Sequence, residues 1–334
     1  DEEKFIAKMA DGEFADFDFI VVDEISMAGA LLTQTLYKHC REDNVKVLLT
    51  GDSSQLRPVK SKTSESPAFG LACKSSELTT VMRQTKGNPI RDLVLLLRAA
   101  VKTGDPVKFK TDTIDGVGVH CLNAKDWGDW AIYNFTHKDY KDDPLSLKAI
   151  AWTNARVNTL NRRVRNLLVG KTISPFIAGE RIIAGNQIKE IDSDEVAMNV
   201  DEEGKILKIQ ESVHPVYGMK TWEATILSDD GGYTICHLLH KDSADEYKAE
   251  LERLADFAKA NRRQWPKFWQ FKESVSDVRS PHAVTCHKSQ GMSIDTVFMD
   301  LLDMRKNRNK KERNQLIHVG ASRAITNLII LTHI

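Results

Sequence analysis

Two short apolar runs rich in β-branched residues enclose a helical segment near the start of this chain. Residues 17–23 and 45–51 end in an acid or a glycine, and residues 28–40 between them have helical leucine spacing. Strand, helix and strand within about 30 residues is the pattern of a parallel βαβ unit. A second series follows, with apolar runs at 147–152, 283–286, 296–301 and 328–332 and a helical segment at 155–168. The sequence therefore predicts an α/β protein built on parallel sheets.

The interval between these runs has a different character. Alternating segments at 205–209, 222–227 and 233–238 are punctuated by Asp-Glu-Glu-Gly at 201–204 and Asp-Asp-Gly-Gly at 229–232. Such tetrapeptides between alternating runs are hairpin signals. We expect a small antiparallel β barrel inserted into the α/β fold, closed by a helix at about 243–261 and the aromatic cluster at 265–269.

Composition excludes several classes of protein. The chain has 334 residues with 47 basic and 47 acidic side chains, so a uniformly basic nucleic-acid binder is excluded. The charge is nevertheless segregated, with acids at 1–24 and 186–203 and bases at 151–171 and 305–313. No apolar run reaches the roughly 18 residues that span a membrane, and the N-terminus has no signal pattern. Five scattered cysteines without a Cys-x-x-Cys pair favour a reducing compartment, so we expect a cytoplasmic protein, in host cytoplasm if phage-encoded.

Acids and polar residues follow the first two expected strands. Asp23 and Glu24 end the first, where Asp23 is suited to hold Mg²⁺ and Glu24 to orient or deprotonate a water. Gln55 follows the second strand and can sense a γ-phosphate, while Arg83 can offset charge on transferring phosphoryl oxygens. The alternatives are an Asp-Glu pair that caps the next helix and an ordinary exposed loop glutamine.

Two further motifs lie near the C-terminus. Residues 285–291, Thr-Cys-His-Lys-Ser-Gln-Gly, follow a strand and combine hydroxyl, imidazole and ammonium donors with a glycine turn. Residues 318–324, His-Val-Gly-Ala-Ser-Arg-Ala, occupy an expected helix before the last strand, where Arg323 is a second candidate arginine finger.

These motifs, in this order and from about residue 17 to the C-terminus, closely resemble those of superfamily 1 helicases, and most of all their Dda/RecD branch. The resemblance implies two RecA-like parallel-sheet domains with ATP and Mg²⁺ between them, the first one incomplete, and an SH3-like barrel at 176–280. It implies 5′ to 3′ movement on single-stranded DNA, in DNA replication, recombination or repair. The nucleotide-binding residues that it implies are Asp23, Glu24, Gln55, Arg83, Gln290, Gly291 and Arg323, of which Glu24, Gln55, Arg83 and Arg323 are catalytic and Asp23 holds the metal.

The implied DNA-binding surface lies on the second domain. It comprises Thr153, Asn154, His287, Lys288 and Ser289, with Trp265 and Trp269 as aromatic platforms for bases. Packing within the insertion is the alternative for the two tryptophans. The expected partners are single-stranded DNA and replication or single-strand-binding proteins, with no membrane. The expected divisions are 1–85 (domain 1A), 86–175 and 281–334 (domain 2A) and 176–280 (domain 2B).

One motif of the family is missing. The phosphate-binding loop Gly-x-x-x-x-Gly-Lys-[Ser/Thr] has no match, because position 165, five residues before Gly170-Lys171-Thr172, is an arginine. We expect a chain truncated before its Asp-Glu motif and deficient in ATP hydrolysis on its own. The alternative is a natural, non-catalytic remnant that binds single-stranded DNA.

Overall fold

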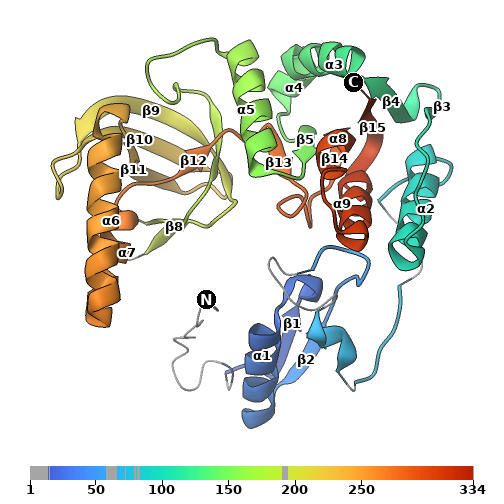
Figure 1. The fold of residues 1–334 in the computed structure, drawn as a ribbon, viewed down its shortest axis with the longest axis horizontal. Coiled ribbons are helices and arrows are strands. Elements are labelled where there is room, and N and C mark those ends of the chain that lie inside the picture. The colour runs from blue at the N-terminus through green and yellow to red at the C-terminus, as the bar shows by residue number, and fades with distance from the viewer. Residues whose placement is uncertain are drawn as a thin grey trace. The chain divides into compact units, whose positions relative to one another are not determined.

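The computed structural model describes residues 14, 16–57, 66–71, 73–78, 80, 83–189 and 195–333. These residues belong to two compact units, of which unit 1 comprises 1–157 and 284–334 and unit 2 comprises 158–283 (Figure 1). Pro58 of the glutamine motif and residues 1–13, most of the acidic N-terminal segment, lie outside the described residues. The expected division at 85–86 falls inside unit 1 and stays a prediction.

Unit 1 begins with the expected βαβ unit. Its elements are β1 (Phe19–Val22), the 3₁₀ helix η1 (Ile25–Met27), α1 (Ala30–Glu42), β2 (Lys46–Leu49) and the 3₁₀ helix η2 (Pro67–Gly70). β1 and β2 are parallel, with Phe19 opposite Lys46 and Val22 opposite Leu49, which confirms the prediction. Phe19 and Val21 on one face of β1 are 51% and 56% exposed, although parallel sheets normally bury both faces.

The rest of unit 1 is a six-stranded sheet with helices. Its elements are α2 (Pro89–Thr103), β3 (Asp112–Ile114), β4 (Val117–Asn123), α3 (Ala124–Thr136), α4 (Lys138–Asp142), β5 (Leu147–Ala151), the start of α5 (Asn154–Leu168), β13 (Ala283–Thr285), β14 (Ile294–Met299), α8 (Leu301–Met304), α9 (Lys310–Ser322) and β15 (Ala324–His333). The strand order is β13-β5-β14-β15-β4-β3. Strands β5, β14, β15 and β4 run parallel, and β3 is an antiparallel edge strand. The mixed α/β class with a parallel sheet therefore agrees with the prediction.

Helices cover both faces of this sheet, as alternation along β14 shows. Val297 and Met299 are fully buried in a core cluster that includes residues of α2 and α9. Phe298 points the other way, and its ring lies 5.4 Å from that of Trp127 and 5.9 Å from that of Phe135, both on α3. Successive strand residues face opposite sides, so the apolar second half of β14, Val297 to Met299, requires helices on both faces.

Unit 2 is mainly antiparallel. It contains β6 (Arg181–Ala184), β7 (Ile188–Lys189), β8 (Val196–Met198), β9 (Glu203–Val213), β10 (Lys220–Ser228), β11 (Tyr233–Leu239), η3 (Lys241–Ser243), α6 (Ala244–Ala260), η4 (Arg262–Gln264), α7 (Trp265–Lys272) and β12 (Val278–Arg279). Five strands form one sheet in the order β11-β10-β9-β6-β12, and β7 pairs with β8. The predicted strands, the helix at about 243–261 and the turn at 229–232 are all present, with Leu227 opposite Tyr233 across that turn.

The other hairpin signal of this unit is wrong. Residues 201–204 do not join two paired strands, because β9 begins inside them and pairs with β6 and β10. Gly204 serves close packing instead, since a Cβ there would lie 2.7 Å from the carbonyl oxygen of Leu227. Among the residues that the structure describes, the end strands β11 and β12 do not pair, so no closed barrel is found.

Candidate functional site

The ends of β1 and β2 bring the Asp23 carboxylate beside the hydroxyl of Thr50. Asp23 accepts a hydrogen bond from that hydroxyl and one of 2.8 Å from the backbone N–H of Glu24. The Thr50 bond, followed by the Glu24 bond, lowers the pKa of Asp23. Parallel neighbouring strands end at the same edge of a sheet, so these contacts follow from the pairing. Asp23 is therefore an exposed, ionised carboxylate at neutral pH.

Glu24 adopts an unusual backbone conformation. Its φ of 51° and ψ of 40° lie in the left-handed region, and η1 begins at the next residue. Such a conformation costs a non-glycine residue about 1–3 kcal/mol and is enriched at functional sites. Burial raises the pKa of the Glu24 carboxyl, while the positive charges of Arg323 and Arg83 partly oppose the rise. A carboxyl whose pKa is raised accepts a proton more readily than an ordinary glutamate does.

The two arginines that the sequence singles out interact electrostatically with Glu24 from distant parts of the chain. Arg83 donates from Nε to Ser293 Oγ at 3.0 Å and from a terminal nitrogen to the Ser322 carbonyl at 2.9 Å. Arg323 is 2% exposed and donates from Nε to the Val319 carbonyl at 3.2 Å. Burial, followed by the charge of Arg83, lowers the pKa of Arg323 to about 10. Two partly desolvated guanidinium groups thus share the surroundings of one carboxyl.

The two candidate glutamines are in direct contact. The side-chain amide of Gln290 donates to Gln55 Oε1 at 3.2 Å, and Gln315 of α9 donates to the Gln55 carbonyl at 2.7 Å. Arg57 pairs with Glu312 at 3.5 Å and joins the same loop to α9 a second time. The structure therefore brings the loop after β2 and the motif after β13 together.

Several buried polar atoms near these residues have no hydrogen-bond partner within the described chain. They are Gln290 Oε1, Ser26 Oγ, Ser54 Oγ and His318 Nδ1. Burial lowers the pKa of His318 to about 4, so this imidazole is neutral at pH 7. Unsatisfied buried polar groups are rare in native proteins and need a reason, such as a bound polar ligand or water.

The motif at 285–291 forms a turn that begins where β13 ends. Thr285 Oγ1 accepts from the Lys288 N–H at 3.2 Å, and the Ser289 N–H donates to the Thr285 carbonyl at 2.9 Å. Ser289 is fully buried and its hydroxyl donates to the Cys286 carbonyl at 2.9 Å. In this conformation Ser289 holds the turn, whereas His287 and Lys288 are half-buried and Gly291 is exposed with a φ of +79°. Burial lowers the pKa of His287.

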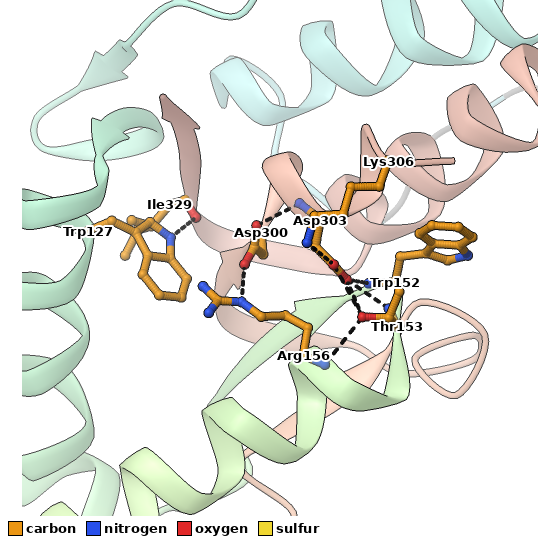
Figure 2. Close-up of polar contacts among 8 residues, drawn as sticks. All are labelled: Trp127, Trp152, Thr153, Arg156, Asp300, Asp303, Lys306 and Ile329. Carbon is orange, nitrogen blue, oxygen red and sulfur yellow. Dashed lines mark hydrogen bonds and ion pairs between the residues drawn. The ribbon is translucent and has the colours of Figure 1, made fainter. Parts of the chain in front are cut away.

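Thr153 lies just after β5, in a network that includes two acids the sequence did not single out (Figure 2). Asp303, only 2% exposed, accepts from the N–H groups of Trp152 at 3.1 Å and Thr153 at 2.8 Å. It also accepts from the Thr153 hydroxyl at 3.0 Å and from Lys306 Nζ at 3.0 Å. Burial raises the pKa of Asp303, but the hydrogen bonds from Thr153 and Lys306 outweigh it, and the pKa falls below its usual range.

Asp300 completes the network from the end of β14. It accepts from Arg156 Nε at 2.5 Å and from the Asp303 N–H at 2.9 Å. Asn154, the first residue of α5, is exposed. The available sequence signal was the Asp-Leu-Leu-Asp stretch directly after the apolar run of β14. Its acids hold the end of the neighbouring strand β5 in place.

Trp265 and Trp269 belong to α7 of unit 2. Both contact Phe268 edge to face, with ring centroids 5.3 Å and 5.1 Å away, and Lys272 Nζ lies 4.5 Å above the Trp269 ring. Trp269 is 46% exposed. The aromatic side chains thus pack on one another, and one ring remains accessible.

No helix among the described residues is long and apolar enough to span a membrane. Within the same residues, no group of three or more His, Cys, Asp or Glu side chains is arranged to hold a metal ion.

Two family models match the chain. A model described as an AAA domain matches residues 3–114, and one described as a UvrD-like helicase C-terminal domain matches residues 281–331. The ATP-dependent DNA helicase Dda of Enterobacteria phage T4 is 27% identical over 315 residues, which cover 84% of this chain and 68% of Dda.

Solved structures of Pif1 helicases are also similar. The Candida albicans Pif1 helicase aligns with a TM-score of 0.54 at 16% identity, over 96% of this chain and 72% of that one, which shows a shared fold. A Bacteroides Pif1 complex with ADP-AlF3 and single-stranded DNA aligns with a TM-score of 0.49 at 14% identity, over 95% and 71% of the two chains. Together with the motifs in the order described above, the two family matches and the Dda relative support the similarity of this chain to superfamily 1 helicases of the Dda and Pif1 type.

Proposed function

We propose that this chain carries most of the machinery of an ATP-dependent helicase that moves 5′ to 3′ on single-stranded DNA. The observation that carries the proposal is the convergence of Glu24, Arg83 and Arg323, which are up to 299 positions apart in the sequence. Proteins seldom gather a carboxyl with a raised pKa and two partly buried guanidinium groups without a functional reason. ATP hydrolysis needs such a set, because negative charge accumulates on the transferring phosphoryl group.

Each residue has a defined task in this proposal. Glu24 orients the attacking water and takes its proton, and the two arginines stabilise the charge that develops. The contact between Gln290 and Gln55 links the motif at 285–291 to the nucleotide, and the unpaired Gln290 Oε1 is available to a polar ligand.

The Asp23 carboxylate fits Mg²⁺. Magnesium usually keeps several waters and binds one or two carboxylates together with substrate phosphates, which agrees with a single ionised, exposed carboxylate. Mg²⁺ bound there would neutralise charge on the phosphates. Thr50 keeps Asp23 oriented and ionised.

The missing phosphate loop determines what this chain does alone. The sequence contains no Gly-x-x-x-x-Gly-Lys-[Ser/Thr], and Phe19 and Val21 on one face of β1 are exposed. We therefore expect little ATP hydrolysis by the 334-residue chain. The alternative function is single-stranded DNA binding without catalysis. Vigorous DNA-stimulated phosphate release by the purified chain would contradict the first expectation.

The proposed DNA surface combines the end of β5 with the turn after β13. Asn154, His287 and Lys288 contact phosphates, while Thr153 and Ser289 hold the two segments in place through their own hydrogen bonds. In unit 2, the accessible Trp269 and its neighbour Trp265 stack on bases. The five-stranded sheet of unit 2 supports the assignment of this segment as the SH3-like 2B domain.

The DNA surface is tested by the salt dependence of binding. Each phosphate contact on a single strand contributes about 0.7 to the slope of log K against log salt, so Lys288→Ala should weaken oligothymidine binding and flatten that slope by about this amount. Lys248→Ala, on the exposed side of α6, is the matched control and should leave the slope unchanged. An unaltered slope in Lys288→Ala would place the DNA elsewhere.

The nucleotide site needs a separate test. In a protein that also contains a phosphate loop, Arg323→Ala should lower the rate of ATP turnover by about 10³-fold or more. A fluorescent ATP analogue should still bind to this variant. Turnover that persists within tenfold of the parent would remove Arg323 from the mechanism.

A further inference from the structure

The basic run 305–313 contributes to a cavity in unit 1 that the proposed function does not use. The cavity has a volume of about 400 Å³ and lies among the C-terminal end of α2, the segment after it, the end of α8 and the first half of α9. Ligand sites in proteins usually measure about 300–1,000 Å³.

Three cations line this cavity, and none of the described residues that line it is acidic. Arg305 and Lys310 are exposed, and neither forms an ion pair within the described part of the chain. The Arg305 guanidinium lies 5.9 Å above the Phe109 ring, and Arg313 donates to the Asn307 carbonyl at 3.4 Å. The positive charge is thus held in place without being neutralised.

The acids nearest in sequence to the three cations are paired elsewhere, and Asp105, between the lining residues Gly104 and Pro106, is exposed and is not part of the lining. Glu312 pairs with Arg57 at 3.5 Å, and Asp303 bonds Thr153 and Lys306. An external anion is therefore the natural counter-charge for Arg305, Lys310 and Arg313.

Most of the remaining lining is apolar, and its one polar side chain, Asn314, donates to the Ala100 carbonyl at 2.9 Å. Leu97 and Ile317 form its buried part, at 2% and 6% exposure, while Val107 and Phe109 are half-buried. An anion that carries apolar groups fits this lining better than a bare phosphate does.

We propose that this cavity binds an acidic peptide segment of a partner protein, with carboxylates on Arg305, Lys310 and Arg313 and an apolar side chain against Val107 and Leu97. Arginine forks match carboxylates in geometry. Lys310 and Arg313 are three residues apart on α9, so their Cβ atoms lie about 5–6 Å apart. That spacing resembles the roughly 6.6 Å between same-face side chains of an extended peptide.

Single-stranded DNA fits the cavity less well. Proteins bind such strands along open basic grooves, with aromatic faces free to stack on bases. Here the Phe109 ring already has the Arg305 guanidinium beside it, so it is less free to stack on a base.

Fluorescence anisotropy with the full 334-residue chain tests the proposal. The probe is a labelled ten-residue peptide of alternating aspartate and leucine or phenylalanine, compared with its asparagine analogue and with oligothymidine. Arg305→Glu and Lys310→Glu should each weaken binding of the acidic peptide by about tenfold or more, because each variant loses a charge-assisted contact with the peptide. Arg308→Glu, in the same run but outside the cavity lining, should change binding less than about twofold.

Three outcomes would overturn the proposal. One is equal loss in Arg308→Glu, which means binding to net charge alone. Another is equal affinity for the asparagine analogue, and the third is that only oligothymidine binding responds to Arg305→Glu and Lys310→Glu, which assigns the cavity to DNA. Both substitutions alter exposed side chains, and unchanged thermal unfolding confirms that the variants are folded.

Discussion

Removal of the Asp303 carboxylate should destabilise unit 1 through the end of β5. The carboxylate accepts two backbone N–H groups, from Trp152 and Thr153, and also bonds the Thr153 hydroxyl and Lys306. Lys306 is 67% exposed and contributes at most about 1 kcal/mol. The effect therefore comes mainly from the buried donors.

The size of the effect depends on the replacement. In Asp303→Ala, two part-buried N–H groups lose their acceptor at about 1–3 kcal/mol each, so we expect a loss of about 3–5 kcal/mol in the free energy of unfolding. Asp303→Asn keeps one oxygen where Oδ2 accepts both N–H groups. The asparagine variant loses the charge and the hydrogen bond from Lys306, so we expect its free energy of unfolding to fall by about 1–2 kcal/mol.

Urea unfolding and hydrogen exchange measure these changes. Exchange at the amides of Trp152 and Thr153 should accelerate strongly in Asp303→Ala and modestly in Asp303→Asn. Asp256→Ala, which removes a 75% exposed carboxylate from a surface ion pair, is the control and should change stability by less than about 1 kcal/mol. Equal costs for the alanine and asparagine variants, or unchanged exchange, would refute the assignment of these bonds.

The same carboxylate has a predictable pH dependence. Its pKa is lower in the folded chain than in the unfolded one, where it is about 3.9. Its contribution is therefore complete above about pH 4 and disappears as pH falls through the folded pKa. Asp303→Asn should lose that part of the acid sensitivity, which urea midpoints between about pH 5 and 2 measure.

Three further predictions concern other parts of the chain. Arg165→Ala should destabilise unit 2 by about 3–5 kcal/mol, because the side chain of Glu180, which is 9% exposed, loses both of its 2.8 Å hydrogen bonds. In urea titrations, Arg165→Lys should recover only part of this stability. Full recovery would show that the charge alone matters. Gly204→Ala should lower the free energy of unfolding by about 1–3 kcal/mol, because the new Cβ would lie 2.7 Å from a carbonyl oxygen of β10. An unchanged melting temperature would show that the two strands can move apart to make room. The exposed Cys73 should react with a thiol reagent in the native state, whereas Cys286 is buried, which raises its pKa, and should react only when the chain unfolds. Peptide mapping distinguishes the two labelled cysteines. Rapid labelling of Cys286 in the native state would contradict its burial.

Local sequence predicted the first βαβ unit, several strands of the larger sheet and the strands β9 to β11 because their signals are local, but it did not predict α2, β4 or α3. The apolar run of β14 and the leucine spacing of α1 depend on the side-chain period, which neighbouring residues set. The hairpin predicted at 201–204 was wrong because Gly204 is needed where another strand approaches closely. The sequence does not reveal whether a glycine serves a turn or close packing.

The sequence alone singled out Asp23, Glu24, Arg83 and Arg323 as candidates for ATP hydrolysis, and their catalytic roles stay a prediction. The tertiary structure decided their state: the left-handed backbone of Glu24 and its proximity to both guanidinium groups depend on strands and helices far apart in the chain. It also showed Asp300 and Asp303 as supports of β5 and the basic run 305–313 as part of a cavity. Burial and pairing of charges depend on what packs around them, and sequence spacing does not contain that information.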